Sequence, residues 1–147
     1  MSTNLWKDCL RWLVEANLIP LNQRILWEEA QVIDLANLLR DGVLLCQLLV
    51  QLDPNGSDLR EACLRPQMSQ FLCLKNIRFF LHGCLNRLHL PLGDLFEPHM
   101  LYDCSNFGRV LHTLSRVSHS AIAIKAGLKP FPGKNFLVCL ISSNFNN

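Results

Sequence analysis

Cysteine and histidine are the residues of this sequence that best suit metal chemistry. The densest grouping is Cys73, His82, Cys84 and His89, and Zn²⁺ binds thiolates and imidazoles. Their gaps match no common structural zinc site, and on one predicted helix they cannot converge on a tetrahedral centre. We therefore expect no metal and no cofactor, and we interpret these side chains as buried thiols and partly exposed imidazoles.

A second pattern with possible chemistry is the segment that begins with Gly127 and ends with Gly133, followed by Lys134 and Asn135. A phosphate-binding loop has the form G-x-x-x-x-G-K-[ST], in which backbone N–H groups surround phosphate and a hydroxyl binds the metal. Here the spacing is one residue too long, prolines remove donors, and Asn135 replaces the hydroxyl. The segment is interpreted as a linker at the end of a domain.

A cysteine nucleophile would be expected in a recognisable motif or beside a Gly-rich turn, and no cysteine here has such surroundings. We predict no catalytic residue and no enzymatic activity.

Basic residues on the polar sides of two predicted helices are the remaining candidates for a site. We interpret them as solvated faces, with a protein-binding patch as the alternative. The members of that candidate patch are Lys75, Arg78, Arg109 and Arg116. Fourteen Lys and Arg residues against twelve Asp and Glu give a net charge of +2, far from the concentrated positive charge of nucleic-acid-binding proteins. No nucleic-acid partner is expected.

The elements that would position these residues are helices. Apolar residues recur at spacings of three and four residues, and no stretch shows the alternation of a strand. Asp41 and Gly42 separate two helices, and Ser105 or Asp103 is expected to cap the last one. The predicted helices cover residues 5–16, 32–39, 43–52, 68–89 and 107–117, with a short helical piece at 92–96.

The helical stripes predict the core. Trp12 lies on the apolar side of the first helix, so a core role is favoured over an exposed binding aromatic. The expected core residues are Trp12, Leu45, Leu49, Leu74, Ile77, Leu81, Val110 and Leu114. The fold class is all-α, a compact bundle of about four main helices with short connecting helices.

Composition and cysteine usage predict an intracellular protein. Hydrophobic residues make up 50% of the 147 residues, enough for one core. Seven scattered cysteines, mostly in apolar runs, are typical of reduced cytosolic thiols. We find no secretory signal and no apolar run of transmembrane length, so we predict a cytoplasmic protein that does not insert into membranes. We also expect a monomer.

The order of several short motifs resembles the calponin-homology (CH) domain. These motifs are Trp6-Lys7, Trp12-Leu13, the run from Leu39 to Leu49, Lys75-Asn76-Ile77, Phe80-Leu81, the segment from Asp94 to Glu97, Leu101-Tyr102-Asp103 and the run from Phe107 to Leu111. Residues 64–78 and Pro130-Phe131-Pro132 are similar to the Vav branch of the family. The resemblance covers about residues 4–132.

The resemblance implies a regulatory role. Vav proteins are guanine nucleotide exchange factors for Rho and Rac GTPases, and their CH domain helps to hold the exchange module inactive. We therefore expect protein partners, namely exchange-factor domains in cis or in trans. The exchange domains are not in this chain, so exchange activity is not implied. The alternative function is binding of actin filaments, as in CH proteins with two such domains.

The expected domain boundary lies at Pro132. Residues 1–132 are predicted to form the CH domain, and residues 133–147 a divergent tail outside it. The tail has neither the acidic character nor the tyrosines expected after a Vav CH domain, and Tyr102 is the only tyrosine in the chain.

Overall fold

The described part of the protein is a bundle of helices. A computed structural model describes residues 5–20, 22–23, 26, 28–56, 62, 64–65 and 69–131, and within these residues it contains no strand. The elements in chain order are α1 (Leu5–Glu15), α2 (Val32–Leu39), α3 (Val43–Leu52), α4 (Gln70–Asn86), the 3₁₀ turn η4 (Leu92–Asp94), α5 (Pro98–Tyr102), α6 (Phe107–Ser118) and α7 (Ala121–Lys125). The all-α prediction is confirmed.

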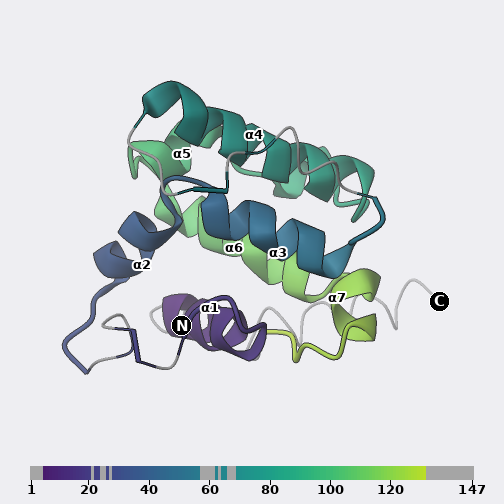
Figure 1. The fold of residues 1–147 in the computed structure, drawn as a ribbon, viewed down its shortest axis with the longest axis horizontal. Coiled ribbons are helices and arrows are strands. Elements are labelled where there is room, and N and C mark those ends of the chain that lie inside the picture. The colour runs from purple at the N-terminus through teal and green to yellow at the C-terminus, as the bar shows by residue number, and fades with distance from the viewer. Residues whose placement is uncertain are drawn as a thin grey trace.

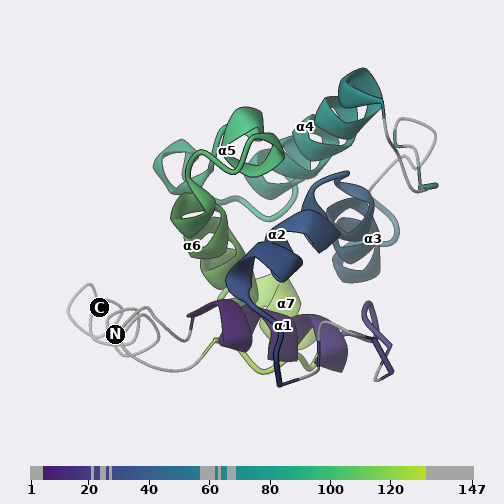
Figure 2. The ribbon, with the colours of Figure 1, turned by 90° about the vertical axis from the view of Figure 1, so that its left-hand side faces the viewer.

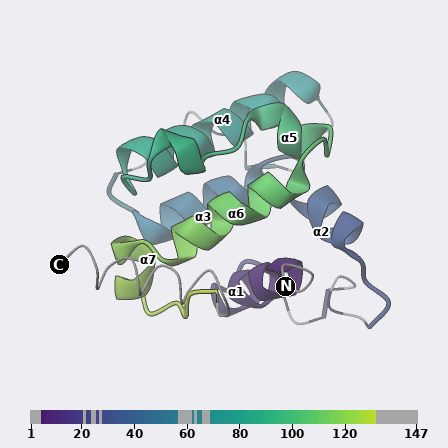
Figure 3. The ribbon, with the colours of Figure 1, turned by 180° about the vertical axis from the view of Figure 1, so that it is seen from behind.

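The helices lie in three tiers. In Figure 1, α4 and α5 occupy one side of the bundle, α3 and α6 run through the middle, and α1 and α7 lie on the opposite side. The view from behind keeps the same order (Figure 3). Seen from the left-hand side, α4 forms an outer edge of the molecule, with α3 behind one flank (Figure 2). The middle tier is therefore covered on both sides.

The most extensive packing joins α3 and α4, which run parallel. Gly42 lies against Asn76 at the start of α3, and Gly83 lies against Leu49 further along. Gly42 has a φ of +76°, and an added Cβ there would lie 2.7 Å from the Cβ of Asn76. Only glycine fits both the left-handed backbone and the close approach. Helix α3 can therefore start directly against the middle of α4.

A buried amide fixes the corner between α2 and α3. The Asn76 side chain is fully buried, and its Nδ2 donates to the carbonyl oxygen of Asp41 at 3.1 Å. The Asp41 carboxylate accepts from the Val43 N–H at 3.0 Å, as expected for a residue that caps the next helix. Asn76 thus connects α4 to the turn that starts α3.

The C-terminal segment of the described chain is part of the core. The rings of Phe131 and Trp12 are both fully buried, and they meet edge-to-face with centroids 5.7 Å apart. The Phe131 N–H donates to Ser118 Oγ at 3.1 Å. A residue that follows the last helix therefore closes the contact between α1 and α6.

Three details of the prediction were wrong. Helix α4 begins at Gln70 and ends at Asn86, rather than at residues 68 and 89, because Ser69 Oγ accepts from the Leu72 N–H and His89 adopts a φ of +59°. The cap of α6 is Asn106, whose side chain accepts from the Arg109 N–H at 3.1 Å. The short helices α5 and α7 were not predicted individually, because they contain too few residues to show a period.

Some predictions fall on residues that lie outside the described ones. These are the domain boundary at Pro132, the tail 133–147, the segment from Pro132 to Asn135, and the thiols of Cys63 and Cys139. Among the helices described, none has both the length and the apolar character needed to cross a membrane.

Candidate protein-binding surfaces

The structure separates the four basic residues of the candidate patch into two pairs. Lys75 and Arg78 are exposed on α4, whereas Arg109 and Arg116 are half-buried on α6. The Arg109 guanidinium donates to the carbonyl oxygens of Leu95, at 3.2 Å, and of Gly93. Arg109 and Arg116 therefore hold the chain before α5 against α6. The four predicted residues are divided between two helices, and their role in protein binding stays a prediction.

Asp94 is the acidic partner of the α6 pair. Its Oδ2 lies 3.2 Å from Arg116 Nε, and its Oδ1 lies 3.0 Å from His112 Nε2. Its backbone carbonyl accepts from Thr113 Oγ1 at 2.7 Å. Burial alone raises the pKa of Asp94, but the hydrogen bond with His112 and the charge of Arg116 outweigh it, so the pKa lies below its usual range. This cluster joins the chain before α5 to α6 and so has a structural role.

The α4 pair lies in a region without carboxylates. From Ala62 to Gly93 the sequence contains four Lys and Arg residues and no Asp or Glu. Among the described residues, neither Lys75 nor Arg78 forms a salt bridge, whereas Arg87 at the end of α4 pairs with Asp53 at 2.7 Å. Sequence analysis named Lys75 and Arg78 as candidate binding residues. The absence of Asp and Glu from residues 62–93 is a stronger indication that this surface is basic.

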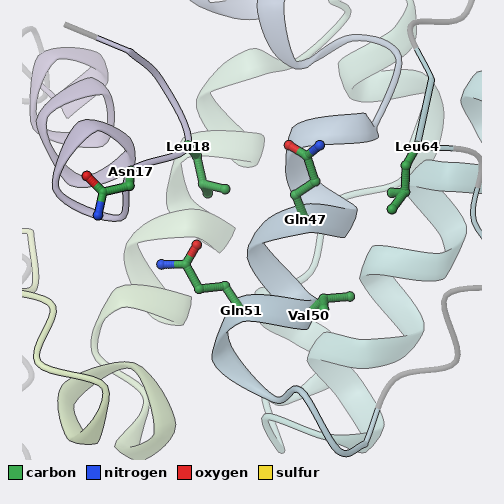
Figure 4. A pocket seen from close by; sticks show the side chains of 6 residues that line it. All are labelled: Asn17, Leu18, Gln47, Val50, Gln51 and Leu64. Atoms are coloured by element: carbon green, nitrogen blue, oxygen red, sulfur yellow. The ribbon is translucent and has the colours of Figure 1, made fainter.

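A shallow hollow lies between α3 and the segment that follows α1. In Figure 4, Asn17 and Leu18 lie on one side of it, Gln47, Val50 and Gln51 lie on α3, and Leu64 lies to the right of α3. Its volume is about 410 Å³. Gln51 Nε2 donates across the gap to the carbonyl oxygen of Ala16 at 2.7 Å. Amide and aliphatic side chains line the hollow, so it offers contact area and hydrogen bonds rather than an acid, a base or a nucleophile.

A second hollow adjoins the first. It shares Leu18, Gln47 and Leu64 and extends past Leu44 to Leu38 on α2, with a volume of about 420 Å³. Sequence periodicity did not reveal either hollow, because each depends on how far the segment after α1 stands away from α3.

The buried thiols are not suited to nucleophilic or metal chemistry. Burial raises the pKa of Cys9 and of Cys84 far above the usual range. Burial, followed by the charge of Asp41, raises the pKa of Cys46 to about 12. Cys104 is the exposed thiol among the described cysteines. In the same part of the chain, no three His, Cys, Asp or Glu side chains gather as a metal site would require.

Seven of the eight expected core residues are buried. Leu74 differs, because it is partly buried and packs against the edge of the core rather than inside it. Two more apolar residues of α4, Phe71 and Leu85, are exposed at 71% and 39%. The apolar stripe of α4 is thus wider than the surface that the neighbouring helices cover.

The sequence matches a protein-family model described as the CAMSAP CH domain over residues 20–102. That match covers more than half of the chain. The chain belongs to the calponin-homology domain family. The expected family and fold are therefore confirmed.

The CH domain is also similar in sequence to curated Vav proteins. It is 53% identical over 127 residues to mouse guanine nucleotide exchange factor VAV3, and this match covers 86% of the chain and 15% of VAV3. It is 52% identical over 128 residues to the human proto-oncogene vav, covering 87% and 15%. Protein vav of Drosophila melanogaster is 50% identical over 115 residues, covering 78% and 14%. The chain spans about 15% of the length of the first two relatives.

Solved structures give the same relationship in three dimensions. A structure described as autoinhibited Vav1 matches with a TM-score of 0.83 and 52% identity, covering 86% of this CH domain and 24% of that chain. Vav1 inhibited by an allosteric inhibitor matches with a TM-score of 0.85 and 51% identity, covering 88% and 24%. The calponin-homology domain of an IQGAP protein from Schizosaccharomyces pombe matches at 0.66 with 19% identity, covering 90% and 75%, which supports the fold alone.

Proposed function

We propose that this CH domain is a regulatory protein-interaction module that holds a Vav-like Rho/Rac exchange module inactive and has no catalytic role of its own. The observation that supports this proposal is the similarity to autoinhibited Vav1, with a TM-score of 0.83 at 52% identity. We further propose that residues 1–132 form the domain and that residues 133–147 lie outside it.

The properties of the described surface support a binding role over a catalytic one. The hollow beside α3 is lined by amide and aliphatic side chains, and α4 presents two cations that form no salt bridge among the described residues. Both features suit recognition of another protein surface. The partners we propose are exchange-factor domains, in cis or in trans, with a cytoplasmic monomer as the acting species.

A nucleotide-exchange assay tests the proposal. The probe is mouse VAV3 lacking the region that matches this chain, and the readout is the release of labelled nucleotide from Rac. We expect the 147-residue chain, added in trans, to slow release in a saturable way. The control is an Ile77→Asp chain, which places a charge in the core and should unfold. An unchanged rate at saturating concentrations of the folded chain would contradict the proposal.

Actin-filament binding is the competing function, and co-sedimentation tests it. Under the regulatory proposal, the chain stays in the supernatant with filaments at low and at physiological salt. Saturable pelleting that persists at physiological salt would instead favour specific docking on actin, because salt screens loose attraction between charges.

A further inference from the structure

The outward side of α4 presents a single line of exposed side chains. We define the α4 outer stripe as Phe71, Lys75, Arg78, His82 and Leu85, all of which are exposed. With 3.6 residues per turn, these five positions fall within an arc of roughly 80° and extend over about 21 Å. Two apolar side chains end the line, and three basic side chains fill its middle.

Nothing in the described part of the bundle covers or neutralises this stripe. Helix α4 lies at an outer edge of the molecule in all three ribbon views (Figures 1, 2 and 3). Lys75 and Arg78 have no salt bridge among the described residues. Phe71 is exposed at 71%, although phenylalanine is among the residue types most often buried.

We propose that the α4 outer stripe is a docking site for an acidic amphipathic helix of a protein partner, with carboxylates opposite Lys75 and Arg78 and apolar side chains against Phe71 and Leu85. The inference deepens the proposed function and rests on it, because it assigns the surface that such a regulatory domain would use.

The geometry favours a helix as the occupant. The stripe is narrow, straight and lies on a convex helix, and two helices pack side by side along such lines at spacings of three and four residues. Charge complementarity then selects the partner. The described stripe contains basic side chains and no carboxylate, so an acidic helix is attracted in its middle, at Lys75 and Arg78, whereas a basic helix is repelled.

A membrane surface fits this stripe less well. Two permanent cations would raise affinity for an anionic bilayer by about thirtyfold, and stable attachment requires a second signal. The apolar side of α4 is turned into the core, as the buried Ile77 and Phe80 show, so the helix cannot lie with that side in lipid.

The test measures binding of a designed peptide to the 147-residue chain. The probe is a labelled helical peptide with a Leu near each end and three Glu between them, and the matched probe has Gln in place of Glu. Fluorescence anisotropy gives the affinity, and ¹⁵N NMR locates the contact. We expect binding of the Glu peptide, shifted amide signals within residues 71–85, and weaker binding as salt increases.

Charge reversal provides the matched variants. Lys75→Glu with Arg78→Glu should weaken binding of the Glu peptide by about tenfold. The control is Lys125→Glu with Lys129→Glu, which makes the same change in net charge at exposed positions elsewhere and should leave affinity within about twofold. Urea melts establish that both variants are folded, and Phe71→Ser, which alters an exposed ring, is an independent variant that should also weaken binding.

Several results would overturn the proposal. Equal weakening by both charge-reversal pairs would indicate bulk attraction, and equal binding of the Gln peptide would remove the role of the carboxylates. Shifts confined to other helices would place the contact elsewhere. Capture of the chain by phosphatidylserine vesicles, without binding of the Glu peptide, would identify a lipid surface instead.

The exchange assay separates this inference from the proposed function. If the wild-type chain slows nucleotide release and the Lys75 and Arg78 reversal does so equally well, the regulatory function stands and the stripe is wrong. If the Glu peptide binds the stripe but the chain never alters release, the docking site stands and the proposed function is wrong.

Discussion

Truncation of Ile77 and of Leu74 to alanine should have unequal effects on stability, although the two residues lie one turn apart on α4. Ile77 is fully buried in the core, whereas Leu74 is partly buried at its edge. Loss of a fully buried side chain of this size costs about 2–5 kcal/mol, because the apolar transfer energy and a cavity both contribute. A partly exposed leucine loses only part of the transfer term and leaves no enclosed cavity, for about 1–2 kcal/mol.

Urea unfolding followed by circular dichroism measures both changes. We expect Ile77→Ala to lower the free energy of unfolding by at least about 1 kcal/mol more than Leu74→Ala does. The slope with denaturant should stay unchanged, as it does when a substitution affects stability alone. Equal losses would refute the helix register described above, as would a near-zero effect at Ile77.

Three further outcomes follow from the contacts described above. Phe131→Ala should lower the free energy of unfolding by about 3–5 kcal/mol in the same urea assay, because the ring is fully buried against Trp12 of α1. A loss below about 1 kcal/mol would show that the segment containing Phe131 is not part of the core. Because the pKa of Asp94 is lowered in the folded state, its ionisation stabilises the fold above the unfolded value of 3.8, and this stabilisation disappears as pH falls through the folded pKa. Asp94→Asn should therefore destabilise at neutral pH and flatten the dependence of the urea midpoint on pH below about 5, and an unchanged acid profile would contradict the cluster. Burial raises the pKa of Cys46 to about 12, so this thiol should resist iodoacetamide at neutral pH while exposed Cys104 is modified. Peptide mapping by mass spectrometry measures both reactions. Faster labelling of Cys46 than of Cys104 would contradict the burial of Cys46.

Local sequence signals predicted most helices well because each signal has a local physical cause. The pair Asp41 and Gly42 marked the boundary between α2 and α3, since a left-handed glycine and a capping carboxylate act within a few residues. The apolar run after Gly42 was correctly predicted to form a helix.

Long-range packing explains what the sequence could not predict. Phe71 and Leu85 have the spacing of core residues, but no described helix reaches far enough around α4 to cover them. The sequence indicated that Arg109 is a surface cation. In the structure it donates to the carbonyl oxygen of Leu95, in the chain before α5. Periodicity identifies one side of a helix, and only the tertiary arrangement determines how much of that side is covered.

The proposed restraint of an exchange module by this domain is tested in a chimera. Residues 1–132 of this chain would replace the matching region of mouse VAV3, and nucleotide release from Rac would be compared with VAV3 that lacks the region. We expect the chimera to be as inactive as intact VAV3, and we expect Ile77→Asp in the graft to restore release. A chimera as active as the truncated protein, with the graft shown to be folded, would contradict the proposed restraint.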